Sequence, residues 1–316
     1  MLDTYGRNIN YLRLSVTDRC NLRCKYCMPA DGICKKQPDE LLTEDEMITA
    51  VRAAASVGIT KLRITGGEPL LKKNILSLCR RAAAVGGIRE VCITTNGVLL
   101  DALAKPLREA GVRRVNLSID TLDAEKYRGI TRGGRLEDAL RGLHAALEAG
   151  FERVKLNAVL IGGFNDCEIG DLAALTRQYP VDVRFIELMP MPDSEIFGEN
   201  AYLSCDAVLQ ALPELLPNGA SGVAQLYRLP DALGDVGLIR PVSALFCASC
   251  SRLRLTADGK LKACLHSPDE RALKGLSQEE MAQQMRLCIA HKPACHAALS
   301  AEHRSQAGRG MYQIGG

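Results

Sequence analysis

The sequence predicts an α/β protein whose strands form a parallel sheet. Over about residues 8–190, six short runs rich in β-branched residues alternate with amphipathic stretches that end in glycine. This alternation predicts right-handed crossovers and either an open doubly wound sheet or a barrel. Six βα units are two fewer than a closed TIM barrel contains. A barrel made from them would therefore be partial and would have an open side.

The expected strands are residues 11–18, 61–66, 90–97, 114–120, 153–161 and 181–188. One expected helix covers residues 42–58, where Thr43 and Glu46 match a capping box and Gly58 is placed to end the helix. Another covers 135–150 and ends at Gly150, directly before the next strand.

Beyond about residue 190 the alternation of strand and helix patterns ends. The stretches 189–200, 212–225 and 229–241 are rich in Pro and Gly, which predicts loops and short irregular elements. We therefore divide the chain into a core over 8–190 and a C-terminal segment over 191–316. With 316 residues, 47% of them hydrophobic, the chain can bury a sizeable core.

Composition also limits the class of protein. The N-terminus lacks the apolar core of a signal peptide and no apolar run is long enough to span a membrane, so we predict a cytoplasmic protein. The net charge of +3 is too small to indicate a general nucleic-acid binder, so any basic site must be local. Thirteen cysteines, an odd number with clustered spacings, favour metal ligation over disulfides.

Six of these cysteines form two triplets. The first is C-x3-C-x2-C and the second is C-x2-C-x13-C; they consist of Cys20, Cys24 and Cys27, and of Cys247, Cys250 and Cys264. A structural zinc site takes four protein ligands, whereas a catalytic metal keeps one position open. Two triplets favour iron-sulfur clusters with one iron free for a small molecule. The second triplet alone also fits a zinc ribbon completed by His266 or by another cysteine.

The other seven cysteines occur singly, and we expect most of them to be buried apolar residues. They are Cys34, Cys79, Cys92, Cys167, Cys205, Cys288 and Cys295.

The first triplet, together with three motifs at the ends of successive expected strands, resembles the radical S-adenosylmethionine superfamily. The motifs are TGGEP at 65–69, TTNG at 94–97 and LSID at 117–120. The resemblance implies a 4Fe-4S cluster whose open iron binds S-adenosylmethionine and cleaves it to a 5′-deoxyadenosyl radical. It also implies cofactor contacts from Tyr26, Gly67, Ser118 and Met189. Gly66 and Gly67 would allow close backbone approach and offer free N–H groups.

Further motifs narrow the family. VKLNAVLIGGFND at 154–166, RFIELMPM at 184–191, the stretch 241–265 around the second triplet and the terminal IGG resemble the molybdenum-cofactor biosynthesis protein A family, GTP 3′,8-cyclase. The resemblance runs nearly end to end. It implies a partial (β/α)6 TIM-type barrel whose open side is covered by the C-terminal segment. That segment would carry a second 4Fe-4S cluster that binds guanine, and both clusters would face one cavity.

In the implied reaction, hydrogen is removed from C3′ of GTP and this carbon is joined to C8 of guanine, giving (8S)-3′,8-cyclo-7,8-dihydroguanosine 5′-triphosphate. This is the first step of molybdenum cofactor biosynthesis. An electron donor such as flavodoxin or ferredoxin and a downstream cyclic pyranopterin monophosphate synthase are the implied partners. A homodimer is compatible with the resemblance, and neither nucleic acid nor a membrane is expected.

Basic residues on several expected strands suit a triphosphate, which is best held by cations that converge from different elements. Any single Lys or Arg is more often a solvated surface charge. The resemblance implies GTP contacts from Arg13, Arg63, Thr94, Lys155, Arg252, Leu253 and Arg254. Lys61 and Arg184 are candidates for further phosphate contacts, and the alternation in RLRL should place Arg252 and Arg254 on one face.

The C-terminal tail is a further implied element. The resemblance places Gly315 and Gly316 in a flexible tail that reaches into the pocket, and the preceding SQAGRG at 305–310 looks too flexible to pack unaided. The loop over 28–40 departs from the commoner family pattern and adds Cys34, a thiol of unknown role.

Two other classes of protein remain as alternatives. A peptide-maturing radical enzyme with an auxiliary cluster would usually carry more cysteines in its C-terminal segment. A zinc protein that binds nucleic acid would have a basic face and would be colourless.

Overall fold

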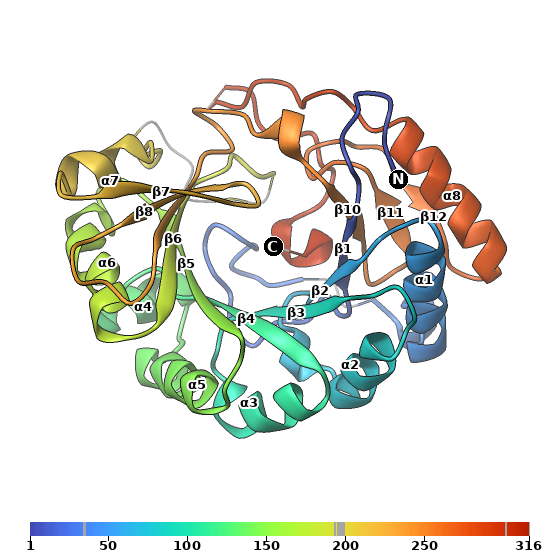
Figure 1. Cartoon of the computed structure of the whole chain (residues 1–316), viewed down its shortest axis with the longest axis horizontal. Coiled ribbons are helices and arrows are strands. Elements are labelled where there is room, and N and C mark those ends of the chain that lie inside the picture. Colours follow the sequence, from blue (N-terminus) through green and yellow to red (C-terminus); the bar gives the residue numbers. More distant parts are fainter. Residues whose placement is uncertain (34–35, 193, 195–199, 301, 316) are drawn as a thin grey trace.

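The computed structural model describes residues 1–33, 36–192, 194, 200–300 and 302–315, so Cys34 and Gly316 lie outside the described residues. Six parallel strands form the wall of a partial barrel (Figure 1). They are β1 (Tyr11–Ser15), β2 (Lys61–Thr65), β3 (Glu90–Thr95), β4 (Val112–Ser118), β5 (Arg153–Leu160) and β6 (Val181–Glu187). The six predicted strands are thus confirmed. Each stops one to three residues before its predicted end, because the last residues of the motifs, such as Gly66, Asn96 and Asp120, belong to the loops that follow.

Helices cover the outside of this wall (Figure 1). They are α1 (Glu44–Ser56), α2 (Ile75–Ala83), α3 (Leu100–Glu109), α4 (Ala124–Thr131), α5 (Leu136–Glu148) and α6 (Ile169–Gln178). The predicted capping box is present, since Glu46 N donates to Thr43 Oγ1 at 3.2 Å and Thr43 N donates to Glu46 Oε2 at 2.8 Å. Gly58 and Gly150 follow α1 and α5 with φ of +92° and +70°, a conformation that glycine adopts without strain.

Alternation along the strands separates the core from the barrel interior. On β1 and β2, Leu12, Leu14, Leu62 and Ile64 are fully buried in the main hydrophobic core, which includes residues of the surrounding helices. The residues between them face the interior, as the pleat of a strand requires. A polar side chain on this inner face is therefore directed into the barrel and not into the apolar layer.

The C-terminal segment extends the sheet at both edges. β9 (Val236–Ile239) pairs in parallel with β6, and β10 (Arg252–Leu255) pairs in parallel with β1. Antiparallel strands continue outward, with β8 (Ala224–Arg228) and β7 (Leu216–Ser221) beyond β9, and β11 (Lys260–Lys262) and β12 (Arg271–Ala272) beyond β10. The segment therefore supplies the two parallel strands that the six βα units lack.

The prediction of loops over 212–225 and 229–241 was wrong, because these stretches contain β7, the start of β8 and β9. β7 forms the edge of the sheet, where Pro217 and Gly219 are tolerated because one side of the strand needs no partner.

In the described part of the chain after β6 there are three further α-helices: α7 (Asp206–Ala211), α8 (Gln278–Ala290) and α9 (Met311–Ile314). α8 lies outside the sheet beside α1, whereas the C-terminal end of the chain lies in the middle of the ring of strands (Figure 1). In the part of the chain that the structure describes, every helix is too short or too polar to cross a membrane.

Candidate active site

The loop that carries the first cysteine triplet is fixed by its neighbours. Its backbone folds into a turn in which Cys27 N donates to Cys24 O at 2.9 Å. Arg23 N and Lys25 N donate to Thr131 O and Ile130 O, each at 3.0 Å, which joins the loop to the end of α4. The cysteines are therefore held between the end of β1 and α4.

Tyr26 is positioned by the LSID motif. Its hydroxyl donates to Asp120 Oδ2 at 2.6 Å, and Val159 N donates to the other carboxylate oxygen at 2.8 Å. Burial raises the pKa of Asp120 to about 6, although these two hydrogen bonds oppose the shift. Asp120 thus links the cysteine loop to β4 and β5.

The glycines of TGGEP have a different role from the one predicted. A Cβ on Gly67 would lie 2.4 Å from Arg19 O, and one on Gly66 would lie 2.6 Å from Thr17 O. Gly67 N donates to Thr17 O at 2.8 Å, so this N–H is not free for a ligand. The prediction that both N–H groups are offered to a ligand was therefore wrong for Gly67. Both glycines let this loop pack tightly against the backbone that leads to Cys20.

Glu68, the acidic residue of the same motif, was missed. Its side chain is buried and accepts hydrogen bonds from Thr95 Oγ1 at 2.7 Å, Asn96 N at 2.8 Å and Leu70 N at 3.0 Å. Burial raises the pKa of this carboxyl to about 7 against the lowering effect of those three donors. The sequence signal for this residue was its place directly after the two glycines of TGGEP and before the TTNG motif. Glu68 joins the loops that follow β2 and β3.

One cavity brings together the first triplet and the residues predicted to contact S-adenosylmethionine. Its lining includes all three cysteines of the first triplet, and the predicted residues Tyr26, Gly67, Thr94, Ser118 and Met189. These residues come from the carboxyl ends of β1 to β4 and from the loop after β6, which is where parallel barrels gather functional groups. Met311 of α9 also lines the cavity, a contribution that the sequence did not predict.

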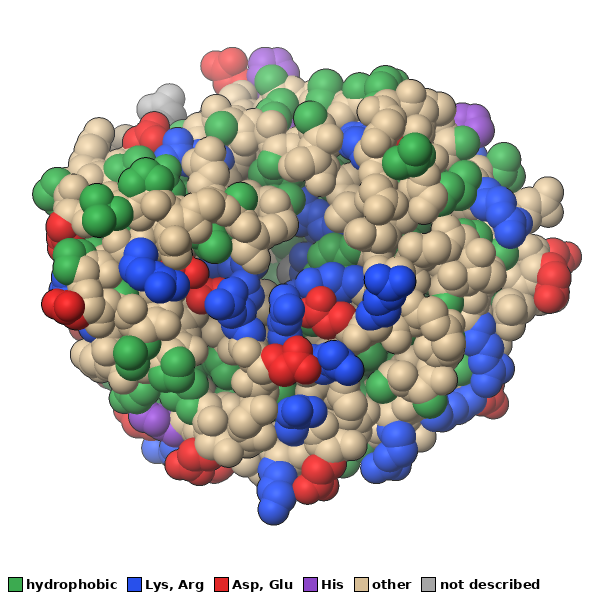
Figure 2. All heavy atoms as spheres, viewed as in Figure 1, with side chains coloured by type: hydrophobic (Ala, Val, Ile, Leu, Met, Phe, Trp, Pro, Cys, Tyr) green, Lys and Arg blue, Asp and Glu red, His purple; other side chains and the backbone are tan. Residues whose placement is uncertain are grey.

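Basic side chains line the barrel interior. In the sheet register, Arg13 lies between Arg254 of β10 and Arg63 of β2. Burial, followed by the charges of neighbouring arginines, holds the pKa of Arg13 well below its usual value. Figure 2 shows Lys and Arg side chains around a hollow in the middle of one face of the molecule. Close cations of this kind favour an anionic ligand, which relieves their repulsion.

Two of the predicted substrate residues contact each other directly. Arg63 Nη1 donates to Thr94 Oγ1 at 3.1 Å, and Arg63 Nε donates to the hydroxyl of Tyr11. Arg63 is buried, and its pKa is raised because its contacts with Tyr11 outweigh the effect of burial.

Lys155 and Arg184 lie on neighbouring strands of the same interior. Lys155 Nζ is 2.9 Å from Asp182 Oδ2, and both side chains are almost fully buried. Burial and the charge of Arg184 lower the pKa of Lys155 to about 8, although Asp182 favours the ammonium. Lys61 differs, because its side chain is partly exposed and pairs with Glu90 at 3.0 Å at the amino end of β2.

Leu253 does not face the basic interior. Its side chain is fully buried in the hydrophobic core, whereas Arg252 and Arg254 alternate with it along β10. The RLRL prediction of a strand is confirmed. Any contact of Leu253 with a ligand would have to use its backbone.

The second triplet lies next to the amino end of β10, a strand parallel to β1, whereas the first triplet follows the carboxyl end of β1. Cys247 begins a short 3-10 helix that ends directly before Cys250, and Cys264 follows β11. Among the described residues, no three Cys, His, Asp or Glu side chains converge on one metal-ion position. His266, one candidate for a fourth zinc ligand, is buried, with Nδ1 2.9 Å from Ser305 Oγ and its ring against His296. These contacts of His266 give no support to its role as a zinc ligand.

Most of the single cysteines are buried, as predicted. Cys79, Cys92, Cys205 and Cys288 are buried, whereas Cys167 and Cys295 are exposed. All six have free thiols.

The tail is packed, although residues 305–310 were expected to be too flexible to pack unaided; contacts with other segments hold it. Ser305 and Ala307 are buried, and Arg309 forms ion pairs with Glu270 at 2.5 Å and Asp258 at 3.0 Å. Ile314 is fully buried and belongs to a small apolar cluster with Met191 and Ala307. These contacts compensate for the entropy that a glycine-rich segment loses on ordering.

Gly315 lies deep in the barrel. Its carbonyl accepts from Arg254 Nη1 at 2.5 Å, and its φ is +80°. None of the second-triplet cysteines lines the cavity beside the first triplet. The expectation that both triplets face one cavity is therefore not met in this structure, in which α9 and Gly315 occupy the barrel interior.

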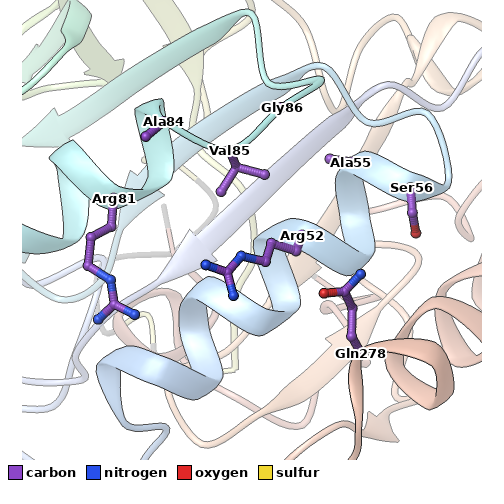
Figure 3. A pocket seen from close by; sticks show the side chains of 8 residues that line it. All are labelled: Arg52, Ala55, Ser56, Arg81, Ala84, Val85, Gly86 and Gln278. Atoms are coloured by element: carbon purple, nitrogen blue, oxygen red, sulfur yellow. The ribbon is translucent and has the colours of Figure 1, made fainter.

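A second pocket lies on the outside, between α1, α2 and α8 (Figure 3). Its lining includes Arg52, Arg81 and Gln278, and none of the residues predicted from the sequence as functional. Arg81 is paired with Glu44 and Asp45 at 2.9 and 2.7 Å, which satisfies its charge within the protein. The barrel interior is the better candidate for the active site.

Comparison with known proteins supports this choice. Residues 14–176 match the Radical SAM superfamily, and residues 181–298 match Molybdenum Cofactor Synthesis C. The chain is 46% identical to a GTP 3′,8-cyclase of Alkaliphilus oremlandii over 100% of both chains. It is 48% identical to a GTP 3′,8-cyclase of Peptoclostridium acidaminophilum, over 100% of this chain and 98% of the relative.

Solved structures share the fold at low sequence identity. Streptococcus suis SuiB aligns with a TM-score of 0.64 and 14% identity, over 87% of this chain and 66% of that protein. Methylornithine synthase aligns with a TM-score of 0.53 and 19% identity, over 66% of this chain and 62% of that protein. The predicted partial-barrel fold and the predicted family are confirmed: the chain belongs to the GTP 3′,8-cyclase family of the radical SAM superfamily.

Proposed function

We propose that this protein converts GTP to (8S)-3′,8-cyclo-7,8-dihydroguanosine 5′-triphosphate in molybdenum cofactor biosynthesis. The observation that carries the proposal is a barrel interior lined by Arg13, Arg63, Lys155, Arg184 and Arg254, with a cysteine triplet at the carboxyl ends of the same strands. A triphosphate would be attracted by the cations while its ribose is directed toward the cysteines.

The residues fit the implied cofactors. Among the described residues, three partly exposed cysteines and no fourth line the cavity beside β1 to β4, which would leave one iron of a cluster open to S-adenosylmethionine. When bound, the cluster and S-adenosylmethionine supply a 5′-deoxyadenosyl radical, the oxidant of the C3′–H bond. We assign cofactor contacts to Tyr26, Gly67, Ser118 and Met189.

We assign the second triplet, Cys247, Cys250 and Cys264, to a second 4Fe-4S cluster that binds guanine. Thiolate formation is favoured at Cys250, where burial opposes ionisation but the charges of Arg252 and Lys292 outweigh it and lower the pKa to about 6. Arg252, the backbone of Leu253 and Arg254 would hold the nucleotide between this triplet and the phosphate-binding cations.

The protein's contribution to the reaction is positional. Arg13, Arg63 and Lys155 hold the triphosphate, and the hydroxyl of Thr94, which already contacts Arg63, lies within the cofactor cavity. Fixing C3′ next to the radical replaces a bimolecular encounter with an oriented one. Met189, Met191 and Met311 give the cavity an apolar side that excludes water.

The reductant and the next enzyme are outside this chain. We propose a low-potential one-electron donor such as flavodoxin or ferredoxin, and a cyclic pyranopterin monophosphate synthase that consumes the product. A homodimer and a cytoplasmic location are part of the same proposal.

The proposed function is tested with protein handled under anaerobic conditions. Protein purified and reconstituted with iron and sulfide should be brown, contain iron for two clusters per chain and convert GTP to the 3′,8-cyclic product when S-adenosylmethionine and dithionite are added. Stoichiometric zinc and a colourless protein would contradict the proposal. The same assay tests the alternative of a peptide-maturing enzyme, which would form no GTP-derived product.

Phosphate recognition should dominate GTP affinity. Arg13→Ala and Lys155→Ala each remove a charged donor from the barrel interior, so each should weaken GTP binding by about 1.5–3 kcal/mol and weaken GMP binding much less. Calorimetry with GTP, GMP and guanosine measures the difference. Lys105→Ala, on the exposed face of α3, is the matched control. Equal affinity of the wild type for GTP and guanosine would refute the phosphate assignment.

GTP affinity should also depend on pH above neutrality. The lowered pKa of Lys155, about 8, means that its ammonium is present below pH 8 and is lost as the pH rises through that value. The terminal phosphate has a pKa of about 6 and is already ionised there. We therefore expect the Kd for GTP to rise between pH 8 and 9 in the wild type. Lys155→Arg, which stays charged, should give a flatter profile; identical profiles would show that Lys155 is not the titrating group.

A further inference from the structure

Lys292 is a buried cation that the proposed reaction does not use. It lies two residues after the end of α8 and is only 3% exposed. Its ammonium donates to Arg252 O at 2.9 Å and to Ala263 O. Within the described residues, no carboxylate lies at ion-pair distance from it, which is unusual because a buried charge without a counter-charge is costly.

The two carbonyls that Lys292 binds belong to the segments of the second triplet. Arg252 is two residues after Cys250, and Ala263 directly precedes Cys264. The ammonium therefore joins two backbone segments whose cysteines are far apart in the sequence. Three cysteine thiolates would also supply the negative charge that the neighbourhood of Lys292 lacks.

Arg7 binds the third backbone segment of the second triplet, which contains Cys247. Its guanidinium donates to Cys247 O at 2.9 Å, to Ala294 O at 3.0 Å, to Pro293 O at 2.7 Å and to Lys292 O at 3.3 Å. Its Nε donates to Asp3 Oδ2 at 2.6 Å, so all five N–H groups of the guanidinium have acceptors. Arg7 is buried, and Asp3 also accepts from the backbone N of Arg7 and of Tyr5 at 2.9 Å.

These contacts form a continuous network. Arg7 connects Cys247 with residues 292–294, and Lys292 connects that stretch with the chain next to Cys250 and Cys264. The stretch is itself fixed by α8, whose Ser277–Glu280 capping box and buried Met281, Met285 and Ile289 anchor the helix to the core. The triplet is thereby held from the N-terminus and from α8 at once.

We infer that Lys292 and Arg7 are positioning residues that hold the three backbone segments of the second cysteine triplet in the geometry that an iron-sulfur cluster requires. The inference rests on the proposed function, in which this triplet holds a cluster. Partners that orient metal ligands typically affect metal affinity by roughly 10–100-fold. Removing either side chain should therefore weaken the second cluster and leave the first intact.

The experiment compares Lys292→Met and Arg7→Gln with the wild type and with Lys105→Met, an exposed control on α3. Each protein is reconstituted anaerobically with iron and sulfide, exposed to increasing chelator and alkylated, and each cysteine is scored by mass spectrometry. Cysteines that ligate a cluster are protected from alkylation. We expect Cys247, Cys250 and Cys264 to lose protection at roughly 10–100-fold less chelator in both variants. Protection of Cys20, Cys24 and Cys27 should be unchanged.

Wild-type protection of the second triplet in both variants would overturn the inference while leaving the proposed function intact. Absence of protection at the second triplet in the wild-type protein would instead overturn the second cluster and the inference with it. If Lys292→Met fails to fold, as circular dichroism and loss of protection at the first triplet would reveal, Arg7→Gln decides by the same criterion.

Discussion

Replacing Cys24 by alanine should abolish reductive cleavage of S-adenosylmethionine, whereas Cys250→Ala should leave part of that cleavage and yield no cyclised product. Cys24 lines the cavity with Tyr26, Gly67 and Ser118, so its loss removes the site of radical formation. Cys250 lies outside the lining of that cavity and next to Arg252. Substitutions in the two triplets should therefore affect different products of the reaction.

The measurement is 5′-deoxyadenosine and cyclised nucleotide in the same anaerobic reaction. Cys167→Ala, which removes an exposed thiol that does not line the cavity of the first triplet, should behave as the wild type and serves as the control. Near-normal product from Cys250→Ala would refute the role of the second triplet. Normal 5′-deoxyadenosine from Cys24→Ala would refute the role of the first.

Gly315→Val should suppress cyclisation although both clusters assemble and S-adenosylmethionine still binds. A Cβ at position 315 would lie 2.1 Å from Thr65 Oγ1, and the φ of +80° disfavours any residue with a branched side chain. The displaced tail would also withdraw the Gly315 carbonyl from Arg254, one of the cations proposed to hold GTP. We expect a loss of product of at least an order of magnitude, roughly 1.4 kcal/mol or more in transition-state stabilisation.

A protein that ends at Ile314 should show the same defect, because it lacks the same backbone groups. Gly170→Val is the control, since a Cβ on Gly170 meets no atom within 4 Å. Cluster content and S-adenosylmethionine affinity are measured for each variant. Full activity of the truncated protein would show that the last two residues have no role in the reaction. The contribution of Gly316 is tested only by this truncation, because it lies outside the described residues.

The local sequence was sufficient to predict the six parallel strands, the α1 capping box and the strand at Arg252–Leu255. Each depends on short-range features, namely side-chain alternation and terminal hydrogen bonds between residues close in sequence. The strands β7 and β9 were missed because Pro217 and Gly219 in β7 and Gly237 in β9 disfavour a strand, and only pairing with β8 and β6 overrides that preference.

By itself, the sequence determined the ligand types and their spacing: two cysteine triplets, the motifs after the strands and the basic residues on alternate strand positions. Only the tertiary structure decided which of these groups meet. The partnership of Gly67 N with Thr17 O, the burial of the Leu253 side chain and the packing of residues 305–315 all depend on contacts between distant segments. The network of Arg7 and Lys292 is the extreme case, since Arg7 binds carbonyls 240 and 287 residues away. Spacing along a chain carries no information about such contacts, because the fold brings distant backbone groups together only after the core has formed.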